Sequence, residues 1–124
     1  MSIISKLFES VCYNTTMNIE ELTQKMLYVK KLYTNFENKK LYKNWTTEET
    51  YQGLVSDVGD LGRLVLAKEG FREMPDIEEK LQHELAEILY ATLFLANSYN
   101  IDLTKAFLDE MSRLEQNLSK ELAE

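Results

Sequence analysis

Cysteine, histidine, proline and glycine are all scarce in this 124-residue sequence, which has one cysteine, one histidine, one proline and four glycines. The lone Cys12 cannot form an internal disulfide, and this favours a cytosolic setting. A single histidine, His83, excludes a histidine-rich zinc site and argues against a catalytic triad. So few prolines and glycines favour long helices over a turn-rich β-protein.

Positive charge and long apolar runs are also lacking. The 14 lysines and arginines are outnumbered by 21 aspartates and glutamates, which gives a net charge of −7. General nucleic-acid binding needs a basic footprint, so no nucleic-acid partner is expected. No stretch approaches the roughly 20 apolar residues of a membrane span, and the first eight residues contain no secretory apolar segment. We therefore expect a cytoplasmic protein without a membrane partner.

Apolar residues recur at three- and four-residue spacing in four segments, and this periodicity predicts four amphipathic helices. The second of them should end by Gly70, and the third near Ser98. Polar residues suited to helix starts stand at Asn18, at Thr46 or Thr47 and at Asp102, and Pro75 suits the start of the third helix at about Asp76. Short connections make the expected fold class all-α, a four-helix antiparallel bundle. Residues 1–16 should form an N-terminal extension and residues 17–124 a single helical domain.

Three features of the predicted helices indicate how they pack. From Leu85 to Ala96 the third is apolar on nearly all sides, which predicts burial at the centre of a bundle or in a dimer interface. Gly59 and Gly62 cost their helix roughly 1 kcal/mol each relative to alanine, so they predict the close approach of another backbone. The fourth helix should present an inner face made by Leu103, Phe107, Leu108, Met111, Leu114 and Leu118.

Two pairs of carboxylates are candidates for chemistry. Asp57 and Asp60 lie three residues apart in the second helix, and Glu84 and Glu87 three apart in the third, so each pair shares a helix face. Glu87 has apolar neighbours, where a carboxylate is costly unless it is paired, protonated or bound to a cation. Placed side by side, the pairs could hold Mg²⁺ or Mn²⁺, and with it a polyphosphate and an activated water. Ordinary helix-surface carboxylates are the alternative, because a chain this acidic has several such pairs by chance.

The acids stand in a pattern that resembles the MazG-like nucleotide pyrophosphohydrolases, which carry Glu-Glu-x-x-Glu on one helix and Glu-x-x-Asp on the next. Here the first motif reads Ser56-Asp57-Val58-Gly59-Asp60, and the second reads Glu84-Leu85-Ala86-Glu87. Downstream, the segment from Leu95 to Leu103 is similar to the family's Leu-Ala-Asn-x-x-Gly-Ile-Asp-Leu, and upstream Trp45 resembles a tryptophan that often precedes the first motif. The resemblance covers about residues 17–120.

This resemblance implies an enzyme that hydrolyses (deoxy)nucleoside triphosphates to monophosphates and pyrophosphate, as a homodimer or a larger even oligomer. Asp57, Asp60, Glu84 and Glu87 would be its metal-binding and catalytic residues, with Mg²⁺ (or Mn²⁺) as cofactor. The chain departs from the family at Ser56, which replaces the first glutamate, and in three acids that differ by one methylene. A catalytically impaired module that binds nucleotides or regulates is therefore the alternative.

Five more residues are candidates for substrate contacts, and each has a structural alternative. Asn97 matches the family's asparagine and could bind substrate or simply end its helix. Trp45 and Tyr90 could line a base pocket or pack in the core. Lys68 and Arg72 could meet phosphates or remain solvated. No base-specific motif is present, so the base stays open, as do phosphoribosyl-ATP as substrate and a purely structural helical interaction protein.

Overall fold

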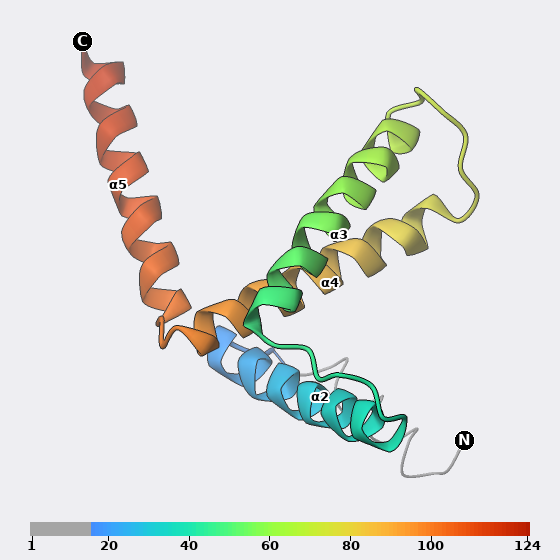
Figure 1. Ribbon diagram of the computed structural model, residues 1–124. Coiled ribbons are helices and arrows are strands. Elements are labelled where there is room, and N and C mark those ends of the chain that lie inside the picture. The colour runs from blue at the N-terminus through green and yellow to red at the C-terminus, as the bar shows by residue number, and fades with distance from the viewer. Residues whose placement is uncertain (1–15) are drawn as a thin grey trace.

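The computed structural model describes residues 16–124, in which all regular structure is helical. Figure 1 shows its four helices, which are α2 (Ile19–Lys39), α3 (Thr47–Lys68), α4 (Ile77–Ser98) and α5 (Leu103–Ala123). No strand occurs in this range, which confirms the all-α prediction. The predicted extension of residues 1–16, with Cys12, lies outside the described residues except for Thr16.

Polar side chains at the starts of α2, α3 and α5 form capping hydrogen bonds, as the sequence predicted. Asn18 Oδ1 accepts a hydrogen bond from Glu21 N at 2.8 Å, and Asn18 N donates to Glu21 Oε1 at 3.4 Å, which completes a capping box. Thr46 N donates to Glu49 Oε2 at 2.9 Å at the start of α3. Asp102 accepts a backbone N–H of the first turn of α5 at 3.0 Å. These bonds satisfy amides that have no partner within the helix.

Left-handed residues end α3 and α4 and turn the chain sharply. Gly70 has a φ of 89° and Asn100 a φ of 55°. Beyond Gly70, Phe71 N donates to Leu66 O at 2.9 Å, and Ile101 N makes the equivalent bond beyond Asn100 at 2.8 Å. Glycine and asparagine adopt this conformation at the lowest cost, so both helix ends follow from the local sequence.

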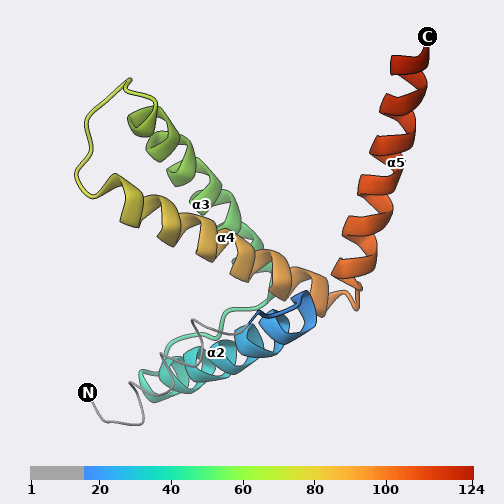
Figure 2. The same ribbon diagram turned by 180° about the vertical axis from the view of Figure 1, so that it is seen from behind.

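The helix α4 is the centre of the fold. It runs antiparallel along α3 for most of its length, and its C-terminal half crosses α2 (Figures 1 and 2). The helix α5 leaves the far end of α4 and stands away from the other three, touching α2 near its base. The buried apolar residues accordingly come from α2, α3 and α4, and they are Met26, Leu64, Ala91, Leu93 and Ala96.

Three packing predictions are wrong within a single chain. Within residues 16–124 no helix lies along α5, so α5 contains no buried residue. Its predicted inner face is largely exposed, including Phe107 and Leu118. The helix α4 is not buried on all sides, because Leu85 and Leu89 remain 54% and 42% exposed. A Cβ added to Gly59 or Gly62 would meet nothing within 4 Å. Within residues 16–124, no helix has both the length and the apolar character needed to cross a membrane.

Candidate functional site

Three of the predicted site carboxylates meet where α3 and α4 lie side by side. One carboxylate oxygen each from Asp57, Asp60 and Glu84 lies within 4.8 Å of the other two. Asp57 and Asp60 are one turn apart on α3, and the antiparallel α4 brings Glu84 opposite them. All three side chains are half-buried. The hairpin of α3 and α4 thus gathers acids from two distant parts of the sequence.

The surroundings of Glu84 disfavour the ionised form of its carboxyl group. Its Oε2 is buried and has no hydrogen-bond partner among the described residues. Burial raises the pKa of Glu84 above its ordinary value, and the negative charges of Asp57 and Asp60 raise it further. A buried carboxylate oxygen without a partner, set among like charges, is a site that a hard divalent cation would satisfy. The three residues therefore fit a magnesium or manganese ion by their chemistry.

Glu87 lies outside this group of three. Its Oε1 is 4.0 Å from His83 Nε2, and its side chain is 43% exposed. The apolar neighbours of Glu87 in the sequence suggested a buried acid, and that interpretation is wrong because one side of α4 is open. Among the described residues, the buried side-chain oxygen that has no hydrogen-bond partner is Oε2 of Glu84, not an oxygen of Glu87.

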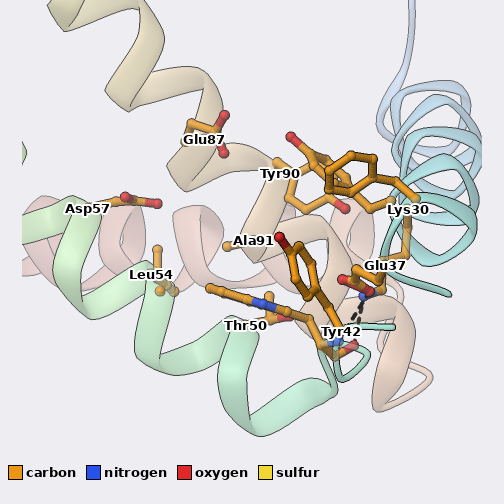
Figure 3. Close-up of a pocket in the computed structure, with 13 residues that line it drawn as sticks. Lys30, Glu37, Tyr42, Thr50, Leu54, Asp57, Glu87, Tyr90 and Ala91 are labelled. Carbon is orange, nitrogen blue, oxygen red and sulfur yellow. Dashed lines mark hydrogen bonds between the residues drawn. The ribbon is translucent and has the colours of Figure 1, made fainter. Parts of the chain in front are cut away.

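A cavity of about 380 Å³ opens beside the carboxylates, between α2, α3, α4 and the chain that joins α2 to α3. Pockets of this size hold small organic ligands. Asp57 and Glu87 line one side of it, and Glu37 lies on the other (Figure 3). Between them the cavity is lined by aromatic side chains, namely Tyr33, Phe36, Tyr42, Trp45 and Tyr90.

The position of Trp45 depends on a hydrogen bond to its backbone and on the close approach of its ring to a glycine. Lys30 Nζ donates a hydrogen bond to Trp45 O at 2.7 Å, which ties the connecting segment to α2. The indole ring lies against Gly53 of α3, where a Cβ would come within 3.0 Å of Trp45 Cζ3. Trp45 is 52% exposed. It is thus a wall of the cavity and not an anchor of the core.

Tyr90 also lines the cavity. Its ring meets that of Tyr33 edge to face, with 6.5 Å between the ring centroids. Burial, followed by the neighbouring Tyr33, Glu87 and Glu37, raises the pKa of Tyr90 above 10.0. Its hydroxyl consequently stays protonated at neutral pH and can donate a hydrogen bond.

The other three candidates lie elsewhere in the chain. Asn97 is exposed and borders a second hollow of about 580 Å³, between the start of α2 and the corner joining α4 to α5. Lys68 pairs with Glu78 and so links the end of α3 to the start of α4. Arg72 is exposed in the connection between those two helices. None of the three is among the residues that line the aromatic cavity.

Glu37 and Gly53 are among the cavity residues that were not predicted from the sequence. Glu37 is 7% exposed, and its Oε1 accepts hydrogen bonds from Asn44 Nδ2 at 3.3 Å and from Trp45 N at 3.4 Å. A signal for it was present, because position 37 continues the spacing of Met26 and Tyr33 on the apolar stripe of α2. An acid on an apolar stripe predicts a buried carboxylate, as apolar neighbours do.

Comparison of the sequence with family models and with curated proteins, and of the fold with solved structures, gives no match. We therefore infer the chemistry of the site from the residues that form it. A group of three carboxylates can hold a divalent cation, and the cation can hold a polyphosphate. The adjoining aromatic cavity can hold a flat ring. A nucleotide combines both ligands in one molecule.

Proposed function

We propose that this chain is a magnesium-dependent pyrophosphohydrolase of nucleoside triphosphates, which releases the monophosphate and pyrophosphate. The observation that carries the proposal is the buried Oε2 of Glu84, which has no hydrogen-bond partner among the described residues and belongs to a carboxylate grouped with Asp57 and Asp60. Asp57 belongs both to this group and to the lining of the aromatic cavity, so a cation site and a ring site adjoin. The resemblance of the acidic motifs to those of MazG-like enzymes supports the same reaction.

In this reaction water adds its oxygen to a phosphorus beside the bridge between the α- and β-phosphates. The bond from that phosphorus to the bridging oxygen breaks, and the water gives up a proton. Asp57, Asp60 and Glu84 would hold Mg²⁺, which when bound neutralises phosphate charge and polarises the water. Glu87 lines the cavity outside the group of three, and we assign it the role of accepting the proton. Trp45 and Tyr90 would face the base, since aromatic rings stack on bases.

A second function is favoured by one position. Ser56 stands where the MazG-like motif has its first glutamate, and it is exposed on α3. Loss of that acid would leave a protein able to hold a nucleotide and a cation but impaired in hydrolysis. Such a protein would act as a nucleotide-binding or regulatory module.

We propose further that a second copy of the chain covers the apolar surface left open here, in a homodimer or larger even oligomer. Large apolar side chains are exposed on all four helices. On α5 they include Phe107, Leu108 and Leu118, and on α4 they include Leu85 and Leu89. Large exposed apolar patches are uncommon on monomeric proteins, and they often mark sites where another protein binds. The twofold relation expected of such assemblies would bring the same helices together from both copies.

Pyrophosphate release from a panel of ribo- and deoxynucleoside triphosphates, with and without Mg²⁺, tests the reaction. The expected result is Mg²⁺-dependent release of pyrophosphate, and no orthophosphate, with loss of activity in Glu87→Gln. The exposed Glu79→Gln, on the same helix, is the matched control and should keep full activity. Nucleotide binding without release would support the second function. Neither binding nor release from folded protein would overturn both.

A further inference from the structure

The acid at the far side of the cavity, Glu37, has a feature that the proposed reaction does not use. Its side chain is almost fully buried, although carboxylates rarely are unless they are paired. Glu37 forms no ion pair with any of the described residues. Both of its hydrogen bonds come from the segment between α2 and α3. Both bonds reach Oε1. Oε2 has no hydrogen bond from the described residues, and Glu37 lines the cavity.

The position of Glu37 relates it to one end of a ligand. Figure 3 shows Asp57 and Glu87 on one side of the cavity and Glu37 on the other. A nucleotide bound with its phosphates toward Asp57 would extend its base between the aromatic rings. The hydrogen-bonding edge of that base would then meet Glu37. This orientation rests on the proposed function, because it takes the carboxylates as the phosphate end.

From this arrangement we infer that Glu37 selects the base. A carboxylate accepts hydrogen bonds and donates none, so it favours a ring edge that carries N–H groups. Adenine and cytosine offer an exocyclic amino group there, and guanine offers an amino group beside a ring N–H. Uracil and thymine instead place carbonyl oxygens on both sides of their single N–H, and these oxygens repel a carboxylate. The preferred substrates are therefore nucleotides of adenine, cytosine and guanine.

The side chain of Glu37 also contacts the segment that joins α2 to α3. Trp45 N and Asn44 Nδ2 donate to Glu37 Oε1, and so Glu37 also holds the segment that carries Trp45. A glutamine would keep one accepting oxygen for these two donors. It would add an amide N–H₂ group that can donate to a carbonyl of uracil or thymine. Glu37→Gln thus separates base selection from support of the loop.

The test uses the intrinsic fluorescence of Trp45, which is the only tryptophan of the chain and lines the cavity. The full chain is titrated with GMP, AMP, CMP, UMP and TMP in the presence of Mg²⁺, because the proposed orientation places the phosphate at the cation site and a monophosphate has no phosphate bridge to hydrolyse. We expect the three amino-bearing monophosphates to bind roughly 5- to 100-fold more tightly than UMP and TMP, as a good hydrogen-bonded base contact allows. In Glu37→Gln the ratio should fall to about threefold or less. Glu20→Gln, an exposed acid on the same helix, should keep the wild-type ratio.

Equal affinity of the wild-type chain for all five monophosphates would overturn the inference, without recourse to any variant. So would an unchanged ratio in Glu37→Gln, or no response of Trp45 at millimolar concentrations. These results are separable from the fate of the reaction. A chain that discriminates among bases through Glu37 but releases no pyrophosphate would keep this inference and lose the enzyme. Release of pyrophosphate without a preference would do the reverse.

Discussion

The indole ring of Trp45 lies so close to Gly53 that a Cβ on the glycine would come within 3.0 Å of Trp45 Cζ3. Such a contact is tighter than nine in ten of those that real Cβ atoms make, so the ring would have to shift by a few tenths of an ångström to admit a methyl group. The absence of a side chain at Gly53 is thus what allows the ring to lie against α3. Gly53 of α3 thus determines where the ring of Trp45, which lines the cavity, can lie.

Gly53→Ala should reduce nucleotide binding without destabilising the fold. Alanine favours a helix over glycine by up to about 1 kcal/mol, which offsets the cost of moving an exposed ring. We expect altered Trp45 emission, a several-fold weaker response to nucleotides and an unchanged or higher melting temperature. Gly62→Ala is the matched control, because a Cβ there meets nothing within 4 Å. Wild-type emission and affinity in Gly53→Ala would contradict this account of the cavity wall.

Glu84→Gln should stabilise the protein when no divalent cation is present. Burial and the charges of Asp57 and Asp60 disfavour the ionised form of Glu84, and glutamine removes that repulsion while keeping the shape. A rise of a few degrees in melting temperature in EDTA is the expected result. Glu79→Gln removes an exposed acid from the same helix and should have little effect. A lower melting temperature in Glu84→Gln would mean that the carboxylate is stabilising and that the group is not repulsive.

The same carboxylate predicts a particular dependence of stability on pH. The folded-state pKa of Glu84 is raised above 4.5, so folding favours its protonated form. Its contribution is fully present below pH 4.5 and is lost as the pH rises through the raised pKa. The metal-free wild type should therefore lose stability over that window relative to Glu84→Gln, as followed by thermal melts from pH 4 to 8. Parallel curves for the two proteins would contradict the assignment of the raised pKa.

Oligomer formation should depend on the exposed face of α5. Leu118 is 60% exposed, so Leu118→Lys should leave the single chain folded while placing a charge in any contact between copies. We expect a shift from dimer toward monomer in sedimentation velocity, and an unchanged helical signal in circular dichroism. Gln116→Lys, on the opposite side of the helix, makes the corresponding change and should stay dimeric. A wild-type protein that is monomeric would contradict the proposed oligomer.

Helix positions could be predicted from the sequence because their determinants are local. The capping box of Asn18 and Glu21 and the left-handed Gly70 depend only on residues within a turn or two. The meeting of Asp57 and Asp60 with Glu84 could also be expected, since short connections make successive helices neighbours. Whether these acids act in catalysis stays a prediction.

The errors concern burial, which depends on residues far away in the sequence. Glu87 has the more apolar neighbours, yet Glu84 faces the other helix and lacks a partner. The stripe on α5 has the spacing of an inner face, but none of the other three described helices lies along it. Glu37 escaped notice because periodicity alone does not show that the connection between α2 and α3 folds back over it.

The central claim is that Asp57, Asp60 and Glu84 form a divalent-cation site, and a titration of the metal-free protein with Mn²⁺ tests it most directly. Electron paramagnetic resonance measures the free ion, so binding is observed without any substrate or reaction. We predict saturable binding by the wild type and by Glu79→Gln, weakened roughly tenfold or more in Glu84→Gln and in Asp60→Asn. Equal binding by all four proteins, or no saturable binding by the wild type, would contradict the claim.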